Sequence, residues 1–168
     1  GVIMEPAMMN INIVPPVPGY LEAVRELTTR HGAVLIFDEI KTGFRLKPGG
    51  YQELVDVTPD LAVFGKALAN GYPLSAVVGR ESVMRAAGDT WISSTLASET
   101  VSLAAARAVI EWHARAEVCE SLGEIGADMR AAVDRAIAAS RIEGVRVDGL
   151  DHMWLIRFDA PERESRFL

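Results

Sequence analysis

Cysteine is almost absent from this sequence, which contains one, Cys119, among 168 residues. A single thiol excludes an internal disulfide framework and every metal site built on several cysteines. Its place in a predicted helix favours an inert packing role. The three histidines lie in separate predicted elements without the spacing of metal ligands, so we expect no metal site.

Positive charge is scarce as well. The net charge is −6 at pH 7, and no cluster of lysine and arginine stands out against it. This balance argues against binding to nucleic acid or to a membrane surface. Neither a signal peptide nor an apolar run long enough to span a bilayer is recognisable. We therefore expect a cytoplasmic protein that acts on a small molecule.

The composition is that of a globular domain, with 49% hydrophobic and 24% charged residues. The two ends of the chain are unusual for a whole protein. It opens on GVIMEP without an initiator methionine and stops on RESRFL, just after an expected strand. We expect it to be an excerpt of a longer chain.

The first third of the sequence predicts a strand, a helix and a second strand. Residues 2–4 form a short apolar run that ends at Glu5-Pro6. Apolar residues then recur at helical spacing over 21–30, and residues 33–37 form the next strand. A βαβ unit has parallel strands covered by helices, so we expect an α/β fold with a mostly parallel sheet.

The remaining elements follow the same kind of pattern. We expect a surface loop over 46–60, strands over 61–64 and 76–78, and a short helix over 81–87. Two long helices follow, with strands over 145–147 and 153–158 joined at Asp148-Gly149. The apolar faces expected for the two helices are Val101, Ala105, Val109 and Trp112, and Val118, Leu122, Ile125, Met129, Val133 and Ala136. The pattern changes near residue 116, which indicates a domain boundary.

Two charged residues come directly after buried strands. Asp38 ends the run Leu35 to Phe37, and Lys66 follows the run Leu61 to Phe64 after a single glycine. Both should emerge at the carboxyl edge of the sheet, where open α/β sheets bind ligands. The alternative is structural: Asp38 caps a helix and Lys66 is a solvated charge.

Phosphate-hydrolysing and serine-hydrolase motifs do not fit this edge. Gly65-Lys66 is followed by Ala67, and Asp60 stands where a phosphate-binding loop has its first glycine. The pattern G-x-S-x-G does not occur. A lysine in a mostly apolar site can instead condense with an aldehyde, and a buried aspartate can pair with a pyridinium nitrogen. These residue types favour pyridoxal phosphate chemistry.

At this point the sequence resembles the class III pyridoxal-phosphate aminotransferases, and among them the glutamate-1-semialdehyde 2,1-aminomutase-like group. The blocks that carry the resemblance are MEP with Asn10 and Pro15-Pro16, PGYLEAVRELTTRHGAVLIFDEIKTGFR, TPDLAVFGKALANGYPLSAVVGR and STLASETVSLAAARA. It implies part of a type I large domain over 1–116, with helices on both faces of its sheet. Residues 117–168 would be part of an α+β small domain.

The resemblance also implies roles for single residues. Asp38 matches the acid that pairs with the pyridine nitrogen, and Ile40 matches the apolar residue on the ring face. Lys66 matches the lysine that forms the Schiff base and moves the proton. Thr95 matches the residue that binds the cofactor phosphate across a dimer interface, which implies a homodimer with shared sites.

Other matched positions point to the substrate side. Glu5 matches an acid near the site, although it could equally end its strand and bind a neighbouring backbone group. Asn10 is kept from the family pattern, and Lys41 stands where many relatives carry glutamine or methionine. The loop around Asn10 lacks the usual glycines, and STLASET lacks the usual Gly-Asn-Pro.

The function expected from this resemblance is amino-group transfer, either between molecules or between adjacent carbons of one. The substrate would be a small amino, keto or semialdehyde compound. Two alternatives stay open: a truncated, non-catalytic relative that serves a structural or dimerising role, and another pyridoxal-phosphate reaction such as decarboxylation or racemisation. Relatives are more than twice this long and supply a phosphate loop that these residues lack, so the isolated chain is expected to bind the cofactor weakly or not at all.

Overall fold

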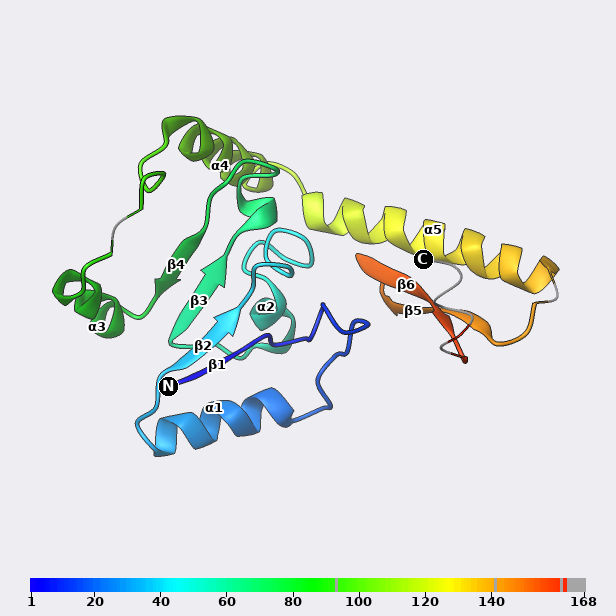
Figure 1. The fold of residues 1–168 in the computed structure, drawn as a ribbon, viewed down its shortest axis with the longest axis horizontal. Helices are drawn as coiled ribbons and strands as arrows, with labels where there is room; N and C mark the ends of the chain where they lie inside the picture. The colour runs from blue at the N-terminus through cyan, green and yellow to red at the C-terminus, as the bar shows by residue number, and fades with distance from the viewer. Residues whose placement is uncertain (93, 141, 161, 163–168) are drawn as a thin grey trace.

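The computed structural model describes residues 1–92, 94–140, 142–160 and 162. A four-stranded sheet with its helices is followed by a long helix and a two-stranded sheet (Figure 1). The strands are β1 (Val2–Met4), β2 (Leu35–Asp38), β3 (Leu61–Phe64), β4 (Ala76–Gly79), β5 (Val145–Leu150) and β6 (Met153–Phe158). The α-helices are α1 (Tyr20–Arg30), α2 (Tyr51–Val55), α3 (Glu81–Met84), α4 (Thr100–His113) and α5 (Val118–Ser140), and the 3-10 helices are η1 (Lys66–Leu68) and η2 (Arg85–Asp89).

The larger sheet has the order β1-β2-β3-β4. β1 and β2 pair in parallel, as do β2 and β3, whereas β4 runs antiparallel to β3. This confirms the predicted α/β class with a mostly parallel sheet. The apolar runs of β1, β2 and β3 lie where they were expected, because continuous apolar segments bounded by glycine, proline or charge form buried parallel strands.

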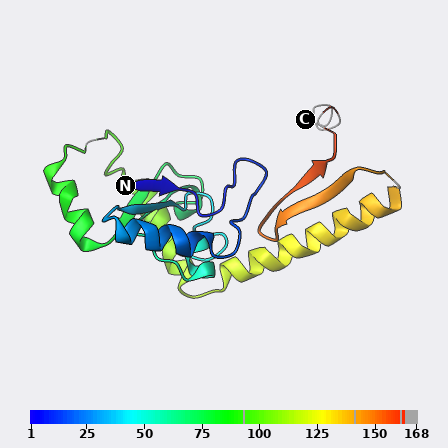
Figure 2. The same cartoon turned by 90° about the horizontal axis from the view of Figure 1, so that it is seen from below.

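One face of this sheet carries the core. Phe37 lies opposite Ala62 in the parallel register, so alternate residues of β2 and β3 share a face. Figure 2 shows the helices on one side of the sheet. The buried residues of this face and its helices are Leu21, Leu35, Phe37 and Tyr51 in one cluster and Ala62, Phe64, Leu68 and Ala106 in the other.

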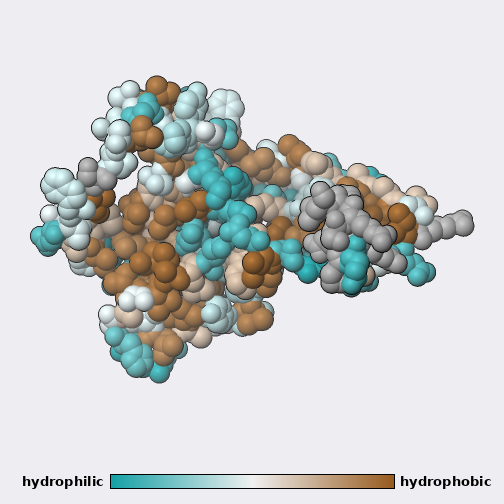
Figure 3. Space-filling model, viewed as in Figure 1, coloured by the Kyte–Doolittle hydropathy of each residue, from teal (hydrophilic) through white to brown (hydrophobic). Residues whose placement is uncertain are grey.

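The opposite face is less covered in the described part of the chain. Ile36 and Val63 are half-buried there, and Ile3 and Val77 are exposed. Figure 3 shows hydrophobic residues gathered over β1 to β3 on the side that Figure 1 presents. The helices described for this chain therefore leave one apolar face of the sheet open.

The expected surface loop over 46–60 is wrong in part. It contains α2, and Leu46, Tyr51 and Val57 within it are buried in the main core. These three residues are spaced irregularly, among glycine, proline and charged residues and beside the exposed Leu54, so no regular spacing marked them in the sequence.

The apolar faces predicted for the two long helices are largely exposed. Val101 and Trp112 of α4 are 55% and 65% exposed, and Ile125 and Met129 of α5 are 57% and 53% exposed. The buried side of α5 carries Cys119 instead, which confirms its packing position. The spacing of apolar residues predicted that α4 and α5 are helices, but it did not predict which side of each helix packs against the rest of the protein.

The turn predicted at Asp148-Gly149 is also wrong. Both residues lie within β5, and the hairpin turns at Asp151-His152. This turn lies against α5 at Gly126. A side-chain carbon at Gly126 would collide with the Asp151 carbonyl, so the glycine allows the close approach. Two features that looked unrelated, a glycine in a helix and a strand turn, are thus one contact.

The predicted boundary near residue 116 falls between α4 and α5. The division itself stays a prediction, and residues 163–168 of its second part lie outside the described residues. No helix in the described ranges combines the length and the apolar character that crossing a membrane requires.

Candidate functional site

The carboxyl ends of β2 and β3 meet at one edge of the sheet. Asp38 is the last residue of β2 and lies opposite Val63 of β3. The Glu39 N–H donates to the Val63 carbonyl at 2.9 Å, so pairing continues one residue beyond the strand. Lys66 follows two residues after the end of β3. The sheet therefore delivers a carboxylate and an amine to the same edge.

Asp38 is oriented by its own turn. One carboxylate oxygen, Oδ1, accepts the Ile40 N–H at 3.0 Å, and the residue is half-buried. The Ile40 side chain lies beside Gly65, where a Cβ would stand 3.5 Å from Ile40 Cγ2. Asp38, Ile40 and the backbone before Lys66 are thus neighbours, and the structure brings these three predicted positions together.

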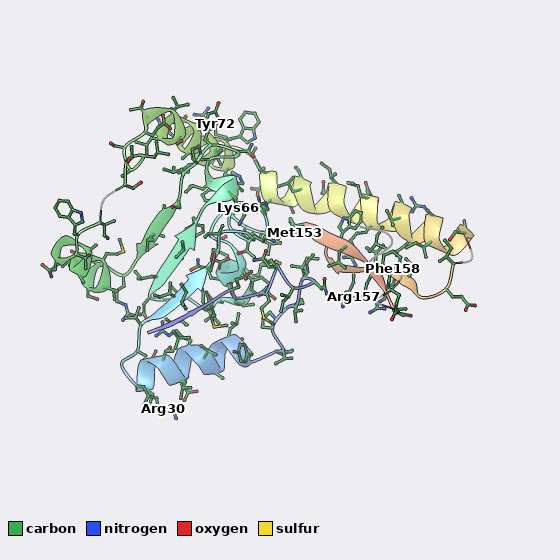
Figure 4. All side chains as sticks on the ribbon, viewed as in Figure 1. Arg30, Lys66, Tyr72, Met153, Arg157 and Phe158 are labelled. Atoms are coloured by element: carbon green, nitrogen blue, oxygen red, sulfur yellow. The ribbon has the colours of Figure 1, made fainter. Side chains whose placement is uncertain are left out.

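Lys66 begins η1 with a positive φ of 46°. Few residues other than glycine adopt this conformation, and such positions gather at functional sites. Its side chain is exposed and lines a cavity of about 480 Å³. Figure 4 shows Lys66 at the centre of the molecule, where β3 ends. The other residues of the cavity are Arg45, Ala67, Asn70, Gly71, Tyr72, Pro73 and Leu74.

Glu39 is a buried carboxylate that sequence reasoning left without a role. It is 0% exposed, and its oxygens accept the N–H groups of Tyr51 at 2.8 Å and Gln52 at 2.9 Å and the hydroxyl of Thr42. Burial raises the pKa of Glu39, as does the neighbouring charge of Asp38, whereas its three donors lower it in part. The donors lie up to 13 residues away, so no local spacing could reveal them.

Arg45 is a second residue that the sequence did not single out. Its Nη1 donates to the Lys41 carbonyl at 2.8 Å, and burial lowers the pKa of its guanidinium. No ion pair joins it to a carboxylate in the described part of the chain. It lines both the cavity of Lys66 and a cavity of about 640 Å³ beside α4 and α5. In the sequence, Arg45 was recognised only as the last residue of the family block that ends in Gly43-Phe44-Arg45.

The remaining predicted residues lie around this centre. Glu5 follows β1, and its Oε2 accepts the Met9 N–H at 3.0 Å. This is the binding to a neighbouring backbone group that was expected from the sequence as the alternative to a site role. Asn10 is exposed, and Lys41 is half-buried. Thr95 is exposed on the segment between α3 and α4, which runs on the far side of β4 from Lys66 (Figure 1). The structure therefore does not bring Thr95 to Asp38 and Lys66.

The residues at this edge fit a pyridoxal group. Lys66 offers an accessible amine for a carbonyl carbon, Asp38 keeps one oxygen available for a ring nitrogen, and Ile40 provides an apolar surface beside Gly65. A phosphate-binding loop is not among the described residues that line the Lys66 cavity. The fit therefore covers the ring and the aldehyde of the cofactor.

Comparison with known proteins gives a consistent result. The family described as aminotransferase class-III matches residues 1–166. The 3-aminobutyryl-CoA aminotransferase of Cloacimonas acidaminovorans is 42% identical over 141 residues, which cover 83% of this chain and 33% of that protein. The glutamate-1-semialdehyde 2,1-aminomutase of Halobacterium salinarum is 37% identical over 162 residues, covering 94% and 36%.

A solved structure shows the same fold. The FumI protein of Sphingopyxis sp. MTA144, in its PLP internal aldimine form, superimposes with a TM-score of 0.89 at 26% identity. The match covers 98% of this chain and 40% of FumI. The chain thus spans about a third of the length of the curated relatives it matches.

Proposed function

Because this chain belongs to the class-III aminotransferase family, we propose that it carries the catalytic lysine of an enzyme that transfers amino groups with pyridoxal 5'-phosphate. The family and the FumI structure indicate this cofactor. One observation of the chain carries the proposal. β2 and β3 bring Asp38 and Lys66 to one edge of the sheet, with Ile40 packed beside Gly65.

The cofactor, when bound, supplies an electron sink for the carbon that bears the amino group. In the proposal, Lys66 would hold the cofactor by its aldehyde carbon as a Schiff base, with loss of water, and the amine, once the substrate amine has replaced it, would be the base that moves a proton at the reacting carbon. Asp38 keeps the ring nitrogen protonated through its carboxylate. Ile40 packs on the ring face and excludes water.

We extend the proposal to the assembly and the substrate. The segment that contains Thr95 runs beyond β4, on the side away from β3 (Figure 1), and this supports a phosphate contact made across a homodimer rather than within one chain. Residues 1–116 would then be the second half of the large domain and 117–168 part of the small domain. The substrate is a small amino, keto or semialdehyde compound, with Glu5, Asn10 and Lys41 on its side.

Lys66 is one of three lysines in this sequence, with Lys41 and Lys47, which makes a direct test practical. The full-length gene product is treated with borohydride, digested and analysed by mass spectrometry. We expect a reduced pyridoxyl group on Lys66. Lys66→Ala should abolish the adduct and slow amino transfer by about 10²- to 10⁴-fold.

The matched control is Lys47→Ala, because Lys47 is exposed and lies outside the proposed site. It should keep the adduct, the visible absorbance of the cofactor and the rate. An adduct on Lys41 or Lys47, or a purified protein that binds pyridoxal phosphate without any adduct, would overturn the assignment. Saturable cofactor binding with turnover excludes the non-catalytic alternative.

A further inference from the structure

Glu39 is an unusual buried group at the edge that carries the site. It is the largest fully buried charged side chain among the described residues, and none of their lysines or arginines forms an ion pair with it. Both of its oxygens act as acceptors from neutral donors. A buried carboxylate that is bound only by neutral donors has a large desolvation cost, so its presence at this position needs a physical explanation.

The bonds of Glu39 join four segments. Its side chain binds Thr42 in the following turn and the first two N–H groups of α2, those of Tyr51 and Gln52. Its own N–H binds Val63 of β3, and its carbonyl accepts the Gly43 N–H at 2.8 Å. The end of β2, the turn, α2 and β3 are therefore tied together through one residue.

The space around this carboxylate is closed. Gly50 has a φ of +87°, and a side-chain carbon there would collide with Glu39 Oε2. The glycine thus serves both its own backbone conformation and the approach of the carboxylate.

Glu39 stands between the two residues that face the proposed cofactor. Asp38 precedes it and has a single side-chain hydrogen bond among the described residues, to the Ile40 N–H. Ile40 follows it and lies beside Gly65. Among the described residues neither side chain has a further polar contact, so the turn that Glu39 holds, together with the pairing of β2 and β3, sets the orientation of both.

We propose that Glu39 is a positioning residue, whose buried carboxylate holds the turn after β2 so that Asp38 and Ile40 stay beside Gly65 and Lys66. The proposal rests on the proposed function of Asp38 and Lys66. It adds that the carboxylate is kept for the geometry of the site as well as for folding, because a displacement of about 1 Å in a catalytic group can cost on the order of a hundredfold in rate.

The test uses the full-length gene product with bound cofactor and three substitutions. Glu39→Gln keeps the shape but removes the charge and turns an N–H of the amide toward a backbone donor. Thr42→Val removes one donor from Glu39 and keeps the side-chain volume. Glu53→Gln is the matched control, because Glu53 lies exposed on the same helix α2. Each variant is measured for its melting temperature, for the pH titration of the cofactor's visible absorbance, and for the single-turnover rate with an amino donor.

We expect Glu39→Gln to shift the midpoint of the absorbance titration and to slow the single turnover by about ten- to a hundredfold. Thr42→Val should change both in the same direction by less, and Glu53→Gln should match the wild type. A Glu39→Gln protein with a lower melting temperature but the wild-type titration and rate would overturn the proposal. If that variant does not fold, an unchanged titration and rate in Thr42→Val overturn it instead. A wild-type protein without cofactor absorbance would contradict the proposed function, which separates that failure from this one.

Discussion

Each end of the four-stranded sheet has a buried carboxylate, and the two carboxylates differ in the charge of their partners. At the amino end, Asp60 pairs with Arg25 at 3.0 Å and Arg80 at 2.9 Å and accepts the Leu35 N–H at 2.8 Å. At the carboxyl end, Glu39 has neutral donors and no described cationic partner. At the amino end, two arginines compensate the buried charge of Asp60. At the carboxyl end, no described cation compensates the charge of Glu39, which lies next to Asp38 in the sequence and at the same sheet edge as Lys66.

The difference agrees with the proposal that the carboxyl end carries the site and that the amino end is structural. Asp60 joins α1, the start of β2, β3 and the residue after β4, none of which carries a predicted site residue. The end with Glu39 contains a positive φ at Lys66 and a cavity beside it. The carboxyl edge combines a buried carboxylate of raised pKa with a lysine of positive φ, and such a combination is typical of functional sites.

The largest expected effect comes from truncating the uncompensated carboxylate. Glu39→Ala leaves the N–H groups of Tyr51 and Gln52 and the Thr42 hydroxyl without their acceptor and opens a cavity. We expect the free energy of unfolding to fall by about 3 to 5 kcal/mol. Urea denaturation of the full-length gene product measures it. A smaller loss of unfolding free energy in Glu39→Ala than in Asp60→Ala would contradict this order of effects.

A smaller effect is expected at the compensated end. Asp60→Ala leaves the buried Leu35 N–H unpaired, but Arg80 is 62% exposed on its side chain and can be hydrated. We expect a loss of about 2 to 3 kcal/mol in the free energy of unfolding, with the site unaffected. Binding of pyridoxal phosphate by the variant, followed by absorbance, is the control. Weakened binding at an unchanged melting temperature would show that this end also supports the site.

The smallest expected effect is a difference in pH dependence. Burial acts to raise the pKa of Asp60, but the Leu35 N–H, Arg25 and Arg80 outweigh it and lower that pKa. Its contribution to stability is therefore present above about pH 4 and is lost as the pH falls further. The raised pKa of Glu39 has the opposite sign, because folding then favours the protonated acid and stability falls as the pH rises through that pKa.

Melting temperatures between pH 3 and pH 8 follow both contributions. Asp60→Asn should lose less stability than the wild type on acidification. Glu39→Gln should lack the fall that the wild type shows above about pH 4.5. Parallel curves for the wild type and both variants would contradict the assigned directions.

The sequence placed Asp38 and Lys66 of the candidate site at one edge of the sheet from local order alone. Asp38 and Lys66 were placed because each directly follows an apolar run, and parallel strands end at one edge of a sheet. Glu39 stood in the same motif, yet its role was missed because its donors Tyr51 and Gln52 belong to a helix hidden in an expected loop. Arg45 was missed because its partner is a main-chain carbonyl.

The sequence by itself determined β1, β2 and β3, the position of Lys66 and the family blocks, because these depend on neighbours within a few residues. Tertiary structure alone decided which sides of α4 and α5 are buried, why Gly126 lies in a helix, and how Glu39 and Asp60 differ. Each of these depends on contacts between segments that are distant along the chain. Two buried carboxylates therefore differ in their partners: Asp60 is bound by two arginines, and Glu39 is bound by neutral donors beside the proposed site.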